Sequence, residues 1–221
     1  LNNYKEKILK KSYKNGIRQG ILKILLTRGV GGRGYKFDRN MNPTVIFLSL
    51  PNVNRSFQFQ KKGIEVKFCN SSISENSQLA GLKHLNRLDS VMARSEWNNN
   101  KFYEGVLSDK CGNIIEGTMT NLFFSKNNVL YTPSLSRCGI NGIIRQVVIE
   151  KAKLFYKDII EKDIKRNHIK TFDDMFVTNS VIKVLPVQKL GEKKFTLTYS
   201  TEKLVEYFNT DNGMFNNLEL I

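Results

Sequence analysis

A lysine in the middle of the chain has the setting of a nucleophile. Apolar residues recur around it with the spacing of one helix face, at Leu82, Leu85, Leu88 and Met92. This pattern predicts a helix that carries Lys83 in its first turn, off the apolar stripe. An amine held there, with a second cation such as Arg87 or His84 nearby, can attack an aldehyde. The alternative interpretation is that Lys83 is one of the many solvated lysines of the chain.

Glu116, further along the chain, is a candidate to bind a cationic ring. Glu116 ends an apolar run that begins at Ile114, and Gly117 follows it. A carboxylate at the end of a strand can bind a protonated ring nitrogen. The alternative, which is commoner for such a residue, is a solvated carboxylate.

A helix start downstream suits an anion. Residues 139–145 open a helix, with Asn141 or Gly142 at its N-cap. Free backbone amides at a helix start, together with the positive end of the helix dipole, bind anions. The alternative is an ordinary helix cap.

A glycine-rich loop near the N-terminus offers a second anion site. Residues 28–35 place Arg28, Arg33 and Tyr35 on a frame of glycines, which suits a carboxylate or a phosphate. The alternative is a plain loop between domains. The glycine spacing matches neither a nucleotide-binding P-loop nor a dinucleotide-binding fingerprint.

The elements that must position these residues follow from apolar periodicity and turn residues. A helix is expected over residues 1–12, ended by Asn15-Gly16, and another over residues 201–208. Strands are expected over residues 20–27, 44–50, 63–69, 103–108, 114–116, 121–125, 129–132, 158–164 and 175–181. Those between 103 and 132 read as an antiparallel meander. A polar shift at residues 51–54 predicts two domains, 1–52 and 53–221.

Composition limits the classes of function. The chain has 221 residues, is 40% hydrophobic and has a formal net charge of +15. The basic residues are scattered among acidic ones without an arginine-rich tract, so we expect no nucleic acid as partner. Three separated cysteines and two histidines predict neither a disulfide framework nor a metal site. No apolar run is long enough for a membrane span, and no signal peptide is visible, so we expect a cytoplasmic protein without a membrane partner.

Three of these features stand in an order that resembles a known family. They are the lysine segment Leu79-Ala-Gly-Leu-Lys-His-Leu-Asn-Arg87, the segment Glu116-Gly-Thr-Met-Thr-Asn-Leu-Phe123 and the helix start Gly139-Ile-Asn-Gly-Ile-Ile-Arg145. The order resembles the fold-type IV pyridoxal-phosphate enzymes, which include branched-chain and D-amino-acid aminotransferases and aminodeoxychorismate lyases. The Lys-His-Leu-Asn-Arg run resembles the lyase branch most. The resemblance implies a small α/β domain plus a larger domain of antiparallel strands with flanking helices.

The resemblance also implies roles for individual residues. Lys83 would form the Schiff base with pyridoxal 5'-phosphate, and Glu116 would pair with the ring nitrogen of this cofactor. The cofactor phosphate would be held by the backbone amides of Ile143 and Ile144, with a contact from Asn179 or Ser180. Arg33 and Tyr35 would face the substrate.

The implied activity is conversion of 4-amino-4-deoxychorismate to 4-aminobenzoate and pyruvate, a step toward folate, by a homodimer. The alternatives are a branched-chain or D-amino-acid aminotransferase on the same fold and, in another class, a basic RNA-binding or catalytically inactive scaffold protein. The resemblance begins partway through the family's small domain. We therefore expect no counterpart here of the arginine with which the family clamps the phosphate, and weak retention of the cofactor.

Overall fold

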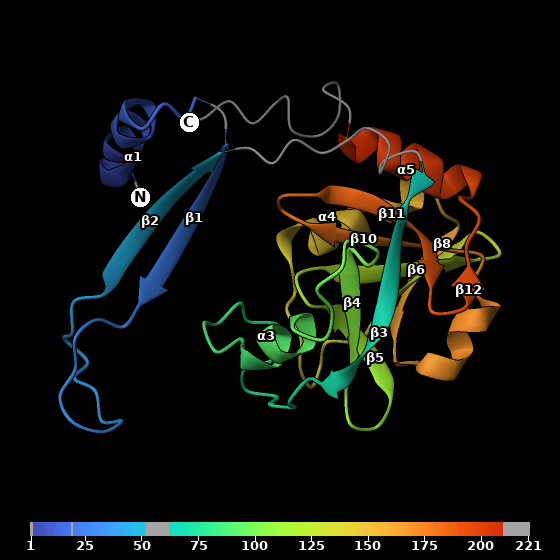
Figure 1. The fold of residues 1–221 in the computed structure, drawn as a ribbon, viewed down its shortest axis with the longest axis horizontal. Helices are drawn as coiled ribbons and strands as arrows, with labels where there is room; N and C mark the ends of the chain where they lie inside the picture. The colour runs from blue at the N-terminus through green and yellow to red at the C-terminus, as the bar shows by residue number, and fades with distance from the viewer. Residues whose placement is uncertain (1, 19, 52–61, 210–221) are drawn as a thin grey trace. The chain divides into compact units, whose positions relative to one another are not determined.

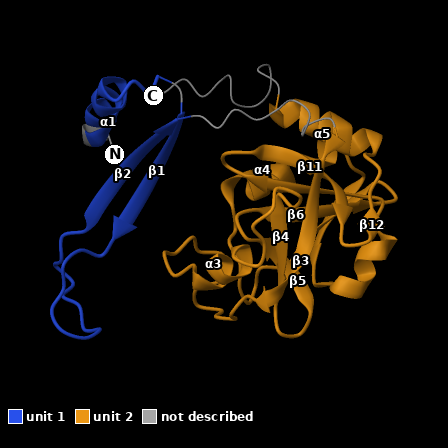
Figure 2. Cartoon of the chain, in the orientation of Figure 1, with its two compact units in different colours: residues 1–55 blue, residues 56–221 orange. Residues whose placement is uncertain are grey.

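The structure is a computed structural model that describes residues 2–18, 20–51 and 62–209. The chain divides into two compact units, residues 1–55 and residues 56–221, which Figure 2 shows in different colours. The boundary predicted from the sequence, between residues 52 and 53, lies outside the described residues and stays a prediction. Both units combine helices with strands, so the predicted mixed α/β class is confirmed.

Unit 1 pairs a helix with a two-stranded antiparallel sheet. Its elements are α1 (Asn2–Lys14), β1 (Gly20–Thr27) and β2 (Thr44–Pro51). Gly16 follows α1 with a φ of +73°, a left-handed conformation that ends a helix and that glycine adopts without strain. The rings of Tyr4 and Phe47 lie 5.4 Å apart and join α1 to β2. The sequence patterns predicted all three elements.

Unit 2 contains a large sheet with helices around it. Its helices are α3 (Leu88–Arg94), α4 (Ile143–Lys151) and α5 (Tyr199–Asn209), with short 3-10 turns η1 (Ala152–Leu154) and η2 (Arg166–Thr171). Its strands are β3 (Ile64–Ser72), β4 (Glu104–Ser108), β5 (Asn113–Gly117), β6 (Asn121–Lys126), β7 (Val129–Pro133), β8 (Asp158–Lys162), β9 (Ile164–Lys165), β10 (Asp174–Asn179), β11 (Lys183–Leu190) and β12 (Lys193–Lys194). Within the described residues of the chain, no helix is long and apolar enough to cross a membrane.

The strand order of this sheet differs from the predicted meander. The order is β8-β7-β6-β10-β11-β3-β4-β5-β9, and β12 pairs with β11 (Figure 1). β4 does pair with β5 and β6 with β7, both antiparallel, but four other strands lie between β5 and β6. The prediction of one continuous meander is therefore wrong, because β10, β11 and β3 enter the sheet from distant parts of the sequence. β3 is parallel to both of its neighbours, β11 and β4.

Strand β6 shows why the centre of the sheet is almost wholly apolar. Leu122 and Phe124 belong to a core cluster with Val106 of β4, whereas Phe123 belongs to a second cluster with Val148 of α4. Successive side chains of a strand point to opposite faces, so β6 is covered on both sides. This packing fixes α4 on one face of the sheet.

A third cluster holds α3 near the strand that carries Glu116. Its buried members are Cys69, Ile73, Ala93, Trp97, Leu107, Ile115 and Cys138. Ala93 of α3 is fully buried, and Ile115 directly precedes Glu116 in β5. The C-terminal turn of α3 thereby packs in the same cluster as β5.

Candidate active site

The segment that carries Lys83 is not the predicted helix. Gly81 forms an isolated parallel bridge with Ile140, and its φ of +81° is left-handed. Residues 82–87 are irregular, and α3 begins only at Leu88. The apolar side chains whose spacing predicted the helix remain 56% to 62% exposed, at Leu82, Leu85, Leu88 and Met92. Within the described residues they pack on no core, so burial gives no free energy for continuing the helix through Lys83.

Backbone hydrogen bonds tie this segment to the loop before α4. The N–H of Gly81 donates to the carbonyl of Gly139 at 2.9 Å, and the N–H of Asn141 donates to the carbonyl of Gly81 at 3.0 Å. Lys83, two residues further on, is exposed. Lys83 thus lies in an irregular segment whose start, at Gly81, is fixed beside the loop before α4.

Glu116 lies at the same place and is buried. Only 2% of the residue is exposed, so the alternative interpretation as a solvated carboxylate is wrong. Its Oε1 accepts a hydrogen bond from Nη2 of Arg87 at 2.8 Å, and its Oε2 accepts one from the N–H of Ile140 at 2.7 Å. Burial raises the pKa of Glu116, while the Ile140 N–H and the positive charges of Arg87 and Lys83 oppose that rise.

The start of α4 provides free backbone amides. Gly142 is the N-cap, with φ −64° and ψ 148°, as one of the two predicted alternatives had it. Ile143 and Ile144 are the first residues of the helix, where backbone N–H groups lack acceptors within the helix. A Cβ at position 142 would lie 2.4 Å from Oδ1 of Asn121, whose Nδ2 donates to the carbonyl of Ile140 at 2.7 Å. Only glycine fits this close approach, and the arrangement is a typical anion site.

The residues predicted to add a phosphate contact lie at the end of β10. Oδ1 of Asn179 accepts hydrogen bonds from the N–H groups of Val181 and Ile182, and its Nδ2 donates to the carbonyl of Met119. The Asn179 side chain therefore shapes the turn after β10. Ser180 is exposed in that turn. The phosphate contact of either residue stays a prediction.

The predicted substrate contacts lie in unit 1. Arg33 and Tyr35 occur between β1 and β2, and both are exposed, Tyr35 completely. In the same loop the Arg28 guanidinium lies 3.8 Å from the centroid of the Phe37 ring. The roles of Arg33 and Tyr35 toward the substrate stay predictions.

Sequence reasoning missed Glu104, which is fully buried at the start of β4. Its Oε1 accepts from the N–H of Gly105 and from the N–H and hydroxyl of Thr118. Its Oε2 accepts from the N–H of Met119 and the hydroxyl of Thr120. The only sequence signal is a glutamate that opens an apolar strand. Glu104 shapes the loop between Glu116 and β6, which also meets the Asn179 side chain.

A cavity of about 380 Å³ adjoins the lysine segment. Its lining includes His84, Arg87 and Gly139. Nδ1 of His84 is buried there and has no hydrogen-bond partner among the described residues. Arg87, which donates to Glu116, thus also lines this cavity.

Comparison with known proteins identifies the group to which this site belongs. The family model for amino-transferase class IV matches residues 1–190 of the chain. The chain belongs to this family. Members of the class IV family use pyridoxal phosphate, so the predicted cofactor is confirmed at the level of the family, and the chain belongs to a class of pyridoxal-phosphate enzymes.

Individual class IV relatives include lyases and aminotransferases. An aminodeoxychorismate lyase of Vibrio harveyi is 28% identical over 183 residues, 83% of this chain and 68% of the relative. A putative branched-chain-amino-acid aminotransferase of Methanocaldococcus jannaschii is also 28% identical, over 204 residues, 88% of this chain and 68% of the relative. The crystal structure of 4-amino-4-deoxychorismate lyase from Pseudomonas aeruginosa superposes with a TM-score of 0.84 at 30% identity, over 92% of this chain and 74% of that one.

The residues of this class IV chain fit the cofactor. An exposed amine at Lys83 suits the cofactor aldehyde, and a carboxylate at Glu116 with two hydrogen-bond donors suits a protonated ring nitrogen. The amides of Ile143 and Ile144 suit the phosphate, since Gly142 leaves no Cβ at the helix start. Residues 139–141 join the segments that carry these groups: their backbone bonds Gly81, two residues before Lys83, and the Glu116 carboxylate, and α4 begins at Ile143.

Proposed function

We propose that the protein is a pyridoxal-phosphate lyase that converts 4-amino-4-deoxychorismate to 4-aminobenzoate and pyruvate. The observation that carries the proposal is that residues 139–141, directly before α4, bond both the backbone of Gly81, two residues before Lys83, and the carboxylate of Glu116. The similarity to lyases of Vibrio harveyi and Pseudomonas aeruginosa, and the Lys83-His-Leu-Asn-Arg87 run, favour a lyase within the family.

The roles proposed for the residues follow from their positions. When bound, pyridoxal phosphate supplies an electron sink next to the substrate carbon that bears the amino group. The amine of Lys83 takes the proton from that carbon. Glu116 holds the ring nitrogen in its protonated form, and the amides of Ile143 and Ile144 anchor the phosphate. The adjacent carbon–oxygen bond breaks, the leaving enolpyruvyl group takes up a proton as pyruvate, and the ring that remains is aromatic 4-aminobenzoate.

Reduction with borohydride tests the position of the cofactor. Purified protein is incubated with pyridoxal phosphate, reduced, digested and examined by mass spectrometry. We expect the label on Lys83, and no label in Lys83→Ala. Lys110→Ala is the matched control, because Lys110 is also an exposed lysine of unit 2. Label on another lysine, or none on the unaltered protein, would refute the proposed site.

Product analysis separates the lyase from its main alternative, a branched-chain or D-amino-acid aminotransferase. This alternative has support of its own, because the Methanocaldococcus jannaschii relative is as similar as the Vibrio harveyi lyase. We expect pyruvate and 4-aminobenzoate from 4-amino-4-deoxychorismate without any amino acceptor. Transfer of nitrogen from an amino acid to a 2-oxo acid, with no release of pyruvate from the chorismate derivative, would establish the aminotransferase instead.

The proposal includes a cytoplasmic homodimer. Five apolar side chains of the lysine segment and α3, which we call the apolar patch, are each 56% to 62% exposed: Leu82, Leu85, Leu88, Val91 and Met92. Patches of exposed apolar side chains of this kind mark association surfaces. A second copy of the chain would cover this patch and enclose the lysine segment.

A further inference from the structure

The guanidinium of Arg87 is held by two hydrogen bonds from one of its nitrogens. Its Nη2 donates to Oγ of Ser90 at 2.9 Å and to Oε1 of Glu116 at 2.8 Å. Ser90 is itself buried in the first turn of α3, which directly follows Arg87. The guanidinium is therefore held by α3 and aimed at β5.

The ion pair with Arg87 stabilises the anionic form of Glu116, which burial disfavours. A buried carboxylate favours its neutral form unless a charge or hydrogen-bond donors stabilise the anion. Glu116 has one backbone donor, Ile140, and one charged partner in hydrogen-bond contact, Arg87. Arg87 keeps 24% of its side chain exposed, so the cation retains much of its hydration while it neutralises a carboxylate that is 2% exposed.

By its number of lone pairs, Glu116 can accept a hydrogen bond from a third donor. Each carboxylate oxygen has two lone-pair directions, and among the described residues each oxygen of Glu116 has one protein donor. A ring N–H can therefore be accepted without displacing Arg87 or Ile140.

We propose that Arg87 is a positioning residue that acts through Glu116, holding it as an oriented anion for the protonated ring nitrogen of pyridoxal phosphate. This proposal rests on the cofactor role proposed for Glu116. Arg87 touches neither the substrate nor the cofactor in this role, and its whole effect on cofactor binding passes through the carboxylate.

A double-mutant cycle tests whether Arg87 affects cofactor binding through Glu116. Cofactor dissociation constants are measured by absorbance titration for the unaltered protein, Arg87→Met, Glu116→Gln and the double variant. When the pKa of a carboxyl group changes by one unit, the affinity of its anion for a cationic partner changes about tenfold. We expect about a tenfold loss of affinity in Arg87→Met and in Glu116→Gln, and no more than about a twofold further loss when Arg87→Met is added to Glu116→Gln. Arg87→Lys, which keeps the charge, should recover part of the affinity.

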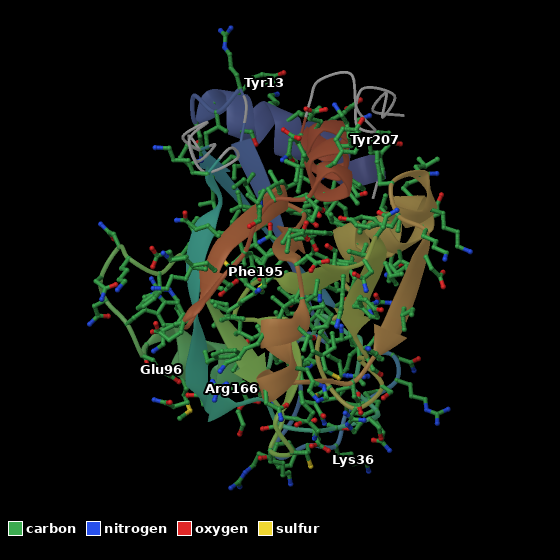
Figure 3. The ribbon with its side chains drawn as sticks, turned by 90° about the vertical axis from the view of Figure 1, so that its right-hand side faces the viewer. Tyr13, Lys36, Glu96, Arg166, Phe195 and Tyr207 are labelled. Atoms are coloured by element: carbon green, nitrogen blue, oxygen red, sulfur yellow. The ribbon has the colours of Figure 1, made fainter. Side chains whose placement is uncertain are left out.

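Two controls separate positioning from stability. Arg166→Met removes a guanidinium that lies 4.1 Å from the Phe68 ring centroid and donates to the Cys69 carbonyl; Arg166 is labelled in Figure 3. It should leave cofactor affinity unchanged. Thermal unfolding of the cofactor-free variants checks that Arg87→Met is folded, and Arg87→Lys provides the comparison if it is not.

The outcomes distinguish this proposal from the proposed function. Equal losses from Arg87→Met with and without Glu116→Gln would overturn the action through Glu116, as would unchanged affinity in Arg87→Met when Glu116→Gln binds weakly. Both results leave the lyase proposal standing if borohydride labels Lys83. Absence of that label in the unaltered protein would overturn the function and this proposal together.

Discussion

Replacement of Glu104 by glutamine should destabilise unit 2 strongly although it changes only one polar group. Glu104 is 0% exposed and accepts five hydrogen bonds, from Gly105, Thr118, Met119 and Thr120. Glutamine keeps one acceptor oxygen for Gly105 and Thr118. Its NH₂ group, however, faces the Met119 N–H, which leaves two donors opposed, one of them on the buried side chain itself.

The magnitude follows from these contacts. A hydrogen bond to a charged acceptor contributes about 1.5–3 kcal/mol, and an unsatisfied buried donor costs about 1–3 kcal/mol. We therefore expect Glu104→Gln to lower the free energy of unfolding by about 3 kcal/mol. For a unit of this size that corresponds to a fall in Tm of about 6–12 °C. Urea unfolding followed by fluorescence of Trp97, which is 5% exposed and the only tryptophan, gives the measurement.

The same substitution should weaken cofactor binding, because the loop held by Glu104 joins Glu116 to the turn at Asn179. Glu96→Gln is the matched control: Glu96, labelled in Figure 3, accepts the backbone N–H groups of Asn70 and Ser71 away from this loop. It should cost stability without changing cofactor affinity. A loss below about 1 kcal/mol in Glu104→Gln would refute the hydrogen-bond reasoning. Equal cofactor affinities in the two variants would refute the link to the site.

Three further predictions concern other parts of the chain. Burial alone would raise the pKa of Glu96, but the backbone N–H groups from which it accepts hydrogen bonds hold that pKa at about 2, below its usual 4.5. The contribution of Glu96 to stability, about 2–3 kcal/mol, is therefore present above pH 4.5 and is lost as the pH falls toward 2. Urea unfolding curves of the unaltered protein and of Glu96→Gln should converge at that low pH, and a constant gap between them would contradict the assignment. Gly142→Ala should lower stability by about 1–3 kcal/mol and weaken cofactor affinity, because its Cβ would meet Oδ1 of Asn121 at 2.4 Å; titration and unfolding curves that match the unaltered protein would disprove this fit. Leu88→Glu should shift the protein from dimer to monomer in light scattering, whereas Leu154→Glu, at an equally exposed leucine, should not; a monomer before any substitution would reject the homodimer.

The sequence by itself determined the chemistry and most of the local elements. The types and order of Lys83, Glu116 and the helix start at Gly142 predicted an amine, a carboxylate and an anion site, and residues 139–141 bond both Glu116 and Gly81, two residues before Lys83. Strands such as β1 and β6 and the glycine stop after α1 were also predicted. Such features depend on neighbours a few residues apart, which periodicity and turn residues report directly.

The tertiary structure alone decided how these pieces are held. Leucine spacing predicted a helix around Lys83, yet the bridge between Gly81 and Ile140 replaces it with an irregular segment. The burial of Glu116 and its bond to Arg87, 29 residues away in sequence, likewise appear only in the fold. Strand order, burial and ion pairing arise from contacts between distant segments. No local pattern encodes them, because their free energy depends on which surfaces the whole chain brings together.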